Sequence, residues 1–272
     1  MRAAMRDAVK KQKGNRAKAK DSKARWKEAN QQKRKVRSLL ALALVGPLAL
    51  VCFLYPLHSM GYFRLWKPAA LSRALSNPQQ TESLDLAHVY LESVPEGIDS
   101  LKNLKTLILD QNEITELDES IFKCEKLETL SAQYNKIKAI PPDIGKTDKL
   151  RSLNLSGNAI SEIPPEVFKL SLLENLKLSN NSLTSLPADI GKLKQLKVLD
   201  LRNNDISNLP DSLSKLTNLE ELNLANNKLS GVPNLTGTPN LKSIVLTGTG
   251  LSKAEIDALR GRRSGGKVMI TR

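Results

Sequence analysis

The sequence is poor in the residues that carry most catalytic and metal chemistry. Its 272 residues include two cysteines and two histidines, and aromatic residues make up only 4%. Two cysteines cannot build a disulfide framework. Neither His58 nor His88 stands near cysteines or paired carboxylates at metal-ligand spacing, and the sequence has no phosphate-binding loop or glycine-rich dinucleotide turn. We therefore expect no enzyme activity, no metal and no cofactor.

Positive charge is concentrated at the N-terminus. The chain has 42 Lys+Arg against 28 Asp+Glu, and 15 of the basic but only 3 of the acidic residues lie in residues 1–37. This basic tail carries a net charge of +12, which leaves +2 for the rest of the chain. It has too few apolar residues to fold alone. Two interpretations stay open: a cytoplasmic topology signal that also contacts anionic lipid, or a docking segment for nucleic acid or a large complex.

A long uncharged run follows the basic tail. Residues 39–57, LLALALVGPLALVCFLYPL, would span roughly 28 Å as a helix, close to the ~30 Å hydrocarbon core of a bilayer. We predict a transmembrane helix over residues 38–58, kinked at Gly46-Pro47. Basic residues precede the run, and aromatic residues typical of a membrane interface cluster at its far end: Tyr55, Tyr62, Phe63 and Trp66.

The uncharged run could be one of three kinds of targeting or anchoring segment. No small-x-small cleavage site follows it, so we favour an uncleaved signal anchor over a cleaved signal peptide or a mitochondrial targeting segment. The basic tail would then stay in the cytoplasm, and the remaining chain would lie on the opposite side, which is periplasmic, lumenal or extracellular. Residues 59–80 are predicted to be a linker, with a helical turn at residues 69–75 that forms an N-terminal lid.

Eight segments repeat between residues 81 and 251. The clearest, residues 150–164, reads L-x-x-L-x-L-x-x-N-x-I-x-x-I-P. Apolar residues two apart lie on one face of a strand, and one such segment cannot bury its apolar face without neighbours. The segments, numbered units 1 to 8, start 23 residues apart with a final step of 22, at Thr81, Leu104, Leu127, Leu150, Leu173, Leu196, Leu219 and Leu241.

This pattern resembles the leucine-rich repeat proteins of the 23-residue intracellular type, which include plant intracellular Ras-group-related repeat proteins and many bacterial proteins. The resemblance covers residues 81–251. It implies an α/β solenoid: a horseshoe with a concave parallel β-sheet and short helical or 3₁₀ turns on the convex side. The sequence lacks the cysteine-clustered caps of many extracellular members, which favours a reducing compartment or a bacterial source.

Three kinds of position recur in each unit. Pairs such as Leu153 and Leu155 point into the core, and alternate residues face outward. Prolines follow the last core residue of most units, but Asp118 takes that place in unit 2, where we expect a freer turn. Asparagine amides should bond backbone groups of their own and the adjacent turn. This predicted ladder comprises Asn112, Asn135, Asn158, Asn181, Asn204 and Asn227.

Residues 252–272 are predicted to cap the C-terminal end of the repeats. Ser252 and Glu255 have the spacing of a capping box, which predicts a short helix through about Arg260. Ile256 and Leu259 would cover the open core of unit 8. Residues 267–271 predict a short strand that runs along this cap.

Two patches on the outward face of the predicted sheet are candidates for partner binding. The first combines Ile108, Asp110, Gln133 and Tyr134 and offers aliphatic and aromatic anchors. The second is charged and comprises Lys177, Asp200 and Arg202, beside Val198.

The sequence as a whole favours a membrane-anchored interaction module that binds a protein partner on its concave sheet. Two alternatives remain. One is a scaffold subunit whose basic tail docks on nucleic acid or a large complex. The other, by family analogy alone, is a cytosolic-side signalling adaptor of the Ras-related type.

Overall fold

The computed structural model describes residues 69–261 and 269–271, which belong to one compact unit, Lys67–Arg272. The basic tail, the predicted membrane segment over residues 38–58 and most of the linker lie outside the described residues. Within the described ranges, no helix is both long and apolar enough to cross a bilayer.

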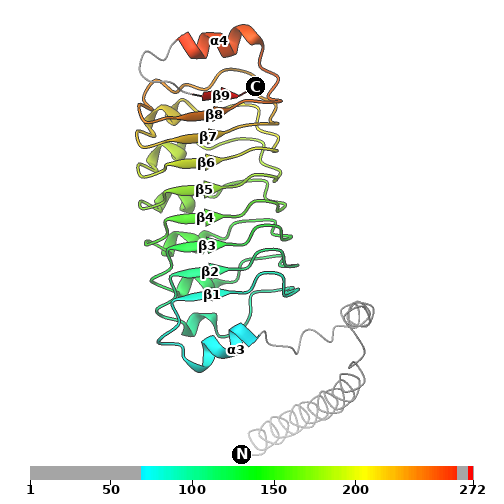
Figure 1. The fold of residues 1–272 in the computed structure, drawn as a ribbon, viewed down its shortest axis with the longest axis vertical. Coiled ribbons are helices and arrows are strands. Elements are labelled where there is room, and N and C mark those ends of the chain that lie inside the picture. The colour runs from blue at the N-terminus through cyan, green and yellow to red at the C-terminus, as the bar shows by residue number, and fades with distance from the viewer. Residues whose placement is uncertain (1–68, 262–268, 272) are drawn as a thin grey trace, which may run out of the picture. The chain divides into compact units, whose positions relative to one another are not determined.

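The repeats form a single parallel sheet, drawn as a stack of arrows in Figure 1. Its nine strands follow the order of the chain, and each contains three residues. Between units 1 and 7 the register advances by 23 residues from strand to strand, as in the pairing of Ser83 with Thr106. The predicted parallel-sheet solenoid is therefore confirmed. The strands are β1 (Ser83–Asp85), β2 (Thr106–Ile108), β3 (Thr129–Ser131), β4 (Ser152–Asn154), β5 (Asn175–Lys177), β6 (Val198–Asp200), β7 (Glu221–Asn223), β8 (Ser243–Val245) and β9 (Met269–Thr271).

Alternation along each strand explains why the units stack. The middle residue of β2, Leu107, is fully buried, whereas its neighbours Thr106 and Ile108 are partly exposed. Leucines and isoleucines from successive units join one continuous core that runs from Leu71 to Leu259. Each unit thus buries its apolar residues against the units before and after it.

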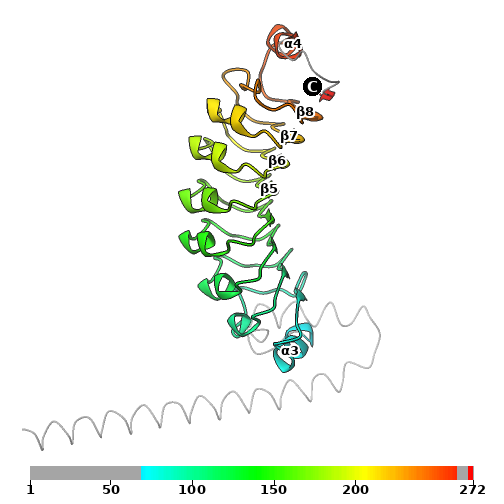
Figure 2. The same ribbon diagram turned by 90° about the vertical axis from the view of Figure 1, so that its left-hand side faces the viewer.

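The side opposite the sheet consists of short 3₁₀ helices, and Figure 2 shows that the solenoid curves around the sheet side. Four of these helices follow a proline with φ between −62° and −74°, a value that the pyrrolidine ring fixes in advance. They are η2 (Ile98–Ser100), η3 (Glu119–Lys123), η4 (Pro142–Lys146), η5 (Pro165–Lys169), η6 (Ala188–Lys192) and η7 (Asp211–Lys215).

In unit 2, Asp118 occupies the position before the 3₁₀ helix that proline occupies in most other units. Its backbone (φ −71°, ψ 148°) matches that of the prolines, and its carboxylate accepts a hydrogen bond from the Ser120 N–H at 2.8 Å. Hydrogen bonds from the side chain and from the backbone N–H of Ser120 lower the pKa of the Asp118 carboxyl. The turn has the same geometry as the others and is capped, so the expectation of a freer turn finds no support in the backbone.

The spacing of the 3₁₀ helices depends on glycine. A Cβ on Gly191 would lie 2.8 Å from the Ser212 carbonyl oxygen, and one on Gly145 would lie 3.3 Å from the Glu166 Cβ. Helices η4 and η6, which carry these glycines, pack more closely on the following helix than η3 and η5 do. The latter carry a buried phenylalanine where η4 and η6 have glycine. Side-chain size at this position therefore sets how closely consecutive units approach on the convex side.

Two helices close the ends of the core. Leu71 and Ala74 of α3 (Ala69–Ser76) are buried at the N-terminal end, and Ile256 and Leu259 of α4 (Lys253–Gly261) are buried at the C-terminal end. The predicted capping box forms: the Ser252 N–H donates to the Glu255 carboxylate at 2.8 Å, and the Glu255 N–H donates to the Ser252 hydroxyl at 3.3 Å.

Strand β9 differs from its prediction. The sequence placed this strand along the cap, but β9 pairs in parallel with β8 and extends the sheet. The physical reason is that the edge of β8 offers backbone N–H and C=O groups that another strand can satisfy.

The asparagines share one hydrogen-bonding pattern. Asn158 Nδ2 donates to the carbonyls of Leu155 in its own unit (2.9 Å) and Ala132 in the preceding unit (3.0 Å). Its Oδ1 accepts from the Ile137 N–H at 3.0 Å. The same bonds recur at Asn112, Asn135, Asn181, Asn204 and Asn227, apart from small changes at the ends of the array. The amides thus tie each turn to the turn before it.

Candidate protein-binding surface

The outward residues of the strands, and those that immediately follow them, make up the concave face. Ile108 ends β2, Ser131 ends β3, and Asp110, Gln133 and Tyr134 lie just beyond these two strands. Because adjacent parallel strands are about 4.8 Å apart, equivalent residues of neighbouring units form columns across the face. The columns decide which side chains of the predicted patches meet.

The polar members of the first patch interlock. Asp110 accepts hydrogen bonds from the Ser131 hydroxyl (2.6 Å), from the Gln133 N–H (3.1 Å) and from the Gln133 side-chain amide (2.8 Å). The Asn154 amide in turn donates to Gln133 Oε1 at 3.2 Å. The structure therefore brings Asp110 and Gln133 together as a fixed pair. Sequence reasoning missed Ser131 and Asn154 as members, although both lie in the Ile108 column.

Tyr134 extends toward unit 4. Its side chain is 51% exposed, and a Cβ on Gly157 would lie 2.5 Å from Cδ1 of its ring. The ring thus lies directly over the Cα of Gly157, where only glycine leaves room for it. Tyr134 therefore extends the first patch from the Asp110–Gln133 pair toward unit 4.

Backbone conformation distinguishes units 1–3 from the later units. The seventh residue after each unit start has φ between 53° and 68°. Glycine and asparagine adopt such values at low cost, whereas other residues are strained by roughly 1 kcal/mol. Units 4 to 8 use glycine or asparagine here, but units 1–3 use His88, Gln111 and Tyr134. Tyr90 also has positive φ (58°) and is 61% exposed. Stability alone does not account for these residues, and retained strain of this kind is a pointer to function.

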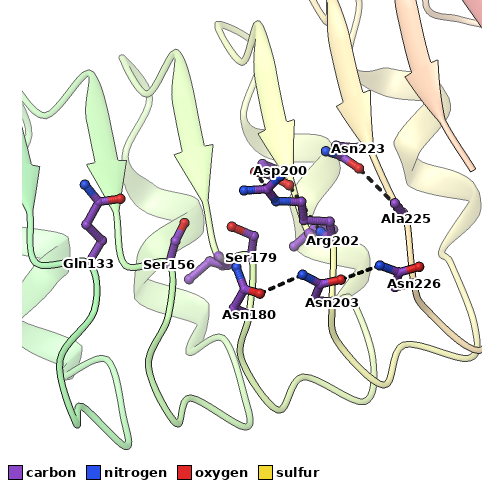
Figure 3. Close-up of polar contacts among 12 residues, drawn as sticks. Gln133, Ser156, Ser179, Asn180, Asp200, Arg202, Asn203, Asn223, Ala225 and Asn226 are labelled. Atoms are coloured by element: carbon purple, nitrogen blue, oxygen red, sulfur yellow. Dashed lines mark hydrogen bonds and ion pairs between the residues drawn. The ribbon is translucent and has the colours of Figure 1, made fainter. Parts of the chain in front are cut away.

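The second predicted patch is arranged by the strands β5 and β6. Lys177 and Asp200 are register partners. Arg202 Nε lies 3.7 Å from Asp200 Oδ2, and the Arg202 N–H donates to Asp200 Oδ1 at 3.2 Å (Figure 3). Val198 is partly exposed at the start of β6. Lys177 and Arg202 are both exposed, whereas Asp200 is only partly exposed, so this patch presents two positive charges beside one partly buried carboxylate.

A second amide ladder lies beside this patch. The Asn203 side-chain amide donates to Asn180 Oδ1 and the Asn226 amide donates to Asn203 Oδ1, each at 2.6 Å (Figure 3). All three residues have positive φ. These amides satisfy one another across units 5–7. This bonding explains why asparagine stands at the positive-φ position in units 5–7, an explanation that does not apply to His88, Gln111 and Tyr134 in units 1–3.

Just before the strands, one column alternates in charge from unit 1 to unit 8. It consists of Glu82, Lys105, Glu128, Arg151, Glu174, Lys197, Glu220 and Lys242. Glu174 is bonded by Arg151 (2.7 Å) and Lys197 (2.6 Å), and hydrogen bonds from Lys197 and Arg151 lower the pKa of its carboxyl. Opposite charges therefore neutralise this edge of the sheet, which is a poor candidate for recognising a charged partner.

The described residues offer little for metal or thiol chemistry. No three His, Cys, Asp or Glu side chains within them are grouped so as to hold a metal ion. Cys124 is fully buried, as the sequence predicted, and burial raises the pKa of its thiol to about 11. A thiol in this state is protonated at neutral pH and unreactive.

Family models described as leucine rich repeat match residues 79–137, 148–206 and 194–251, and a two-copy leucine-rich repeat model matches residues 125–167. No curated protein sequence matches the chain.

Among solved structures, internalin C2 from Listeria monocytogenes is similar with 25% identity and a TM-score of 0.61, over 70% of this chain and 80% of that protein. An internalin, InlF, from the same species has 23% identity and a TM-score of 0.51, over 64% of this chain and 56% of that protein. A leucine-rich repeat protein from Leptospira interrogans has 24% identity and a TM-score of 0.46, over 70% of this chain and 60% of that protein. The chain thus spans less than two thirds of the length of two of these three proteins.

Proposed function

Since the chain belongs to the leucine-rich repeat family, we propose that it is a protein–protein interaction module that binds a protein partner on its concave sheet. The observation that carries this proposal is Tyr134. Its ring is half exposed, is supported by Gly157 and stands on a backbone with φ 54°. Rigid aromatic side chains of this kind are frequent anchors at protein interfaces.

Site-specific photo-crosslinking tests the proposal. A benzophenone amino acid would replace Thr106 or Val198 on the concave face and, as matched controls, Lys123 or Lys192 on the helix side. We expect adducts with one protein from the concave positions and none from the helix-side positions. Equal labelling from both sides, or no adduct from the concave face, would refute concave binding.

The proposal includes a membrane anchor. The uncharged run over residues 39–57 and the basic residues before it support a single-pass protein with a cytoplasmic basic tail and repeats on the other side. Protease protection of intact membranes tests this topology, because the tail and the repeats should be cleaved from opposite sides. Cleavage of both from the cytoplasmic side would instead support the cytosolic-side adaptor.

The charge of the basic tail supports a second candidate, a scaffold subunit that docks on nucleic acid or a large complex. Binding of the full-length chain to RNA should then fall steeply as salt rises, because lysine and arginine displace counterions from phosphate. Weak RNA binding with little salt dependence would remove this candidate.

A further inference from the structure

Charge divides the repeats into two parts. Residues 81–119, which cover unit 1 and most of unit 2, contain ten acidic and two basic residues. Residues 120–259 contain fifteen acidic and seventeen basic residues. The N-terminal part of the array therefore has a net charge of −8, against +2 for the remainder. A surface field of this size selects partners of opposite charge.

The two basic residues of this segment do not offset the charge on the concave face. Lys105 pairs with Glu82 at 3.0 Å in the alternating column before the strands. The Lys102 ammonium donates to the Lys123 carbonyl of η3 on the helix side. The charged residues at the outward positions of β1 and β2 and directly after these strands, Asp85 and Asp110, are therefore all negative. Glu113, further along unit 2, is paired with Lys136 of unit 3.

Two acidic residues lie on this face. Asp85, which ends β1, is exposed and accepts a hydrogen bond only from the Ala87 N–H, at 2.9 Å, within the described part of the chain. Asp110, two residues after the end of β2, accepts hydrogen bonds from Ser131 and Gln133 and forms no ion pair among the described residues.

Apolar and aromatic groups accompany these carboxylates. Ile108 is partly exposed in the column between Asp85 and Ser131. Tyr90 and Tyr134 are the two large hydrophobic side chains that are exposed within the described residues, and both belong to units 1–3. Carboxylates accept charge-assisted hydrogen bonds from guanidinium and ammonium groups, and tyrosine faces attract the same cations.

We propose, building on concave binding, that Asp85, Ile108, Asp110 and Tyr134 form an N-terminal binding surface for an extended arginine- and lysine-rich segment of the partner protein. We choose a basic segment as the partner because its charge complements the acidic N-terminal units. We choose units 1–3 as the site because they contain both these carboxylates and the exposed tyrosines Tyr90 and Tyr134. The polar face of units 5–7, whose amides satisfy one another, contributes little.

Fluorescence anisotropy of labelled octa-arginine with the full-length chain in nonionic detergent at roughly 0.15 M salt tests the proposal. The variant Asp85→Asn/Asp110→Asn should bind the peptide at least tenfold more weakly. The matched control Glu125→Gln/Glu162→Gln removes the same charge from positions outside the proposed surface and should change affinity by less than twofold. Equal weakening by both variants would mean that only net charge matters, and would overturn the proposal.

Tyr134→Asn should change peptide affinity without reducing the stability of the fold, because units 5–7 carry asparagine at the equivalent position. We expect a three- to fivefold loss of octa-arginine affinity with no fall in melting temperature. Unchanged affinity would overturn the role of Tyr134. Binding that appears only after the lysines and arginines of residues 1–37 are replaced by glutamine would identify the chain's own tail as the occupant and overturn a partner in trans.

The outcomes also separate this proposal from concave binding in general. Photo-adducts from position 198 together with no saturable octa-arginine binding would preserve a concave partner and reject the basic segment on units 1–3.

Discussion

Replacing Asn158 with alanine probes the bonds that link successive turns. The substitution removes the amide donor to the Ala132 and Leu155 carbonyls and the acceptor for the Ile137 N–H. Each of the two carbonyls keeps a second donor, because the asparagine of the neighbouring unit also bonds it, at 3.1 Å and 3.0 Å respectively. The Ile137 N–H, in contrast, loses its acceptor next to a side chain that is 0% exposed.

The expected loss of stability comes mainly from the Ile137 N–H, which is left without an acceptor, and less from the two carbonyls, which keep a donor. A buried donor without a partner costs about 1–3 kcal/mol, and the weakened carbonyl bonds add to it, so we expect Asn158→Ala to lower the free energy of unfolding by about 2–3 kcal/mol. Asn175→Ala is the matched control, since Asn175 faces outward from β5 and its side chain makes no hydrogen bond within the described residues. Its effect should stay within about 0.5 kcal/mol.

Equilibrium urea denaturation of the full-length chain, followed by circular dichroism, measures both variants. Equal midpoints for Asn158→Ala and Asn175→Ala would refute the argument that the ladder stabilises the stack. Asn158→Asp tests whether the side chain must donate to the two carbonyls. Its carboxylate would face these carbonyls, so its pKa would rise above the value in the unfolded chain. Stability should therefore be lost as pH rises through that pKa and partly recovered below about pH 4, where the protonated acid can donate again.

Three further predictions concern packing, capping and thiol chemistry. Gly191→Ala should cost about 1–3 kcal/mol in urea denaturation because its Cβ would meet the backbone of the next helix, whereas Gly145→Ala should be near neutral; similar costs for both would contradict the account of helix spacing. Asp118→Ala should cost about 1 kcal/mol at pH 7. Because folding lowers the pKa of Asp118, this difference should shrink as pH falls below about 4, and a cost that does not change with pH would exclude the carboxylate cap. Cys124, followed with Ellman's reagent in a Cys52→Ser background, should react slowly at pH 8 until urea unfolds the repeats, because burial raises its pKa to about 11; rapid reaction of the folded protein would contradict its burial.

The positions within one unit were predictable from the sequence. The 23-residue period identified which leucines face the core, which asparagines share a column and where the convex turns lie. The Ser252–Glu255 box likewise located the start of α4. These features depend on residues close together in the chain or on the same step in every unit, so a repeated pattern is enough to reveal them.

Contacts between different columns were not predictable in the same way. The sequence grouped Ile108, Asp110, Gln133 and Tyr134, but it did not show that Asp110 and Gln133 are joined by a hydrogen bond or that the tyrosine ring packs onto Gly157. Which way a side chain leans across to the next unit depends on its rotamer and on the local φ, and neither repeats when the residue type changes. The glycine at position 157 was visible in the sequence, but its reason became clear only with the ring above it.

The sequence by itself determined a parallel-sheet solenoid, because eight apolar segments of equal length can bury their leucines only by stacking. It also determined the charge of the N-terminal tail and the apolar run that follows. Only the tertiary structure decided how neighbouring units meet: the close approach at Gly191, the bonding of Asp110, the pairing of β9 with β8 and the strained backbone of units 1–3. A one-dimensional period defines each residue's place in its own unit, whereas packing between units is settled by atoms that approach one another in space.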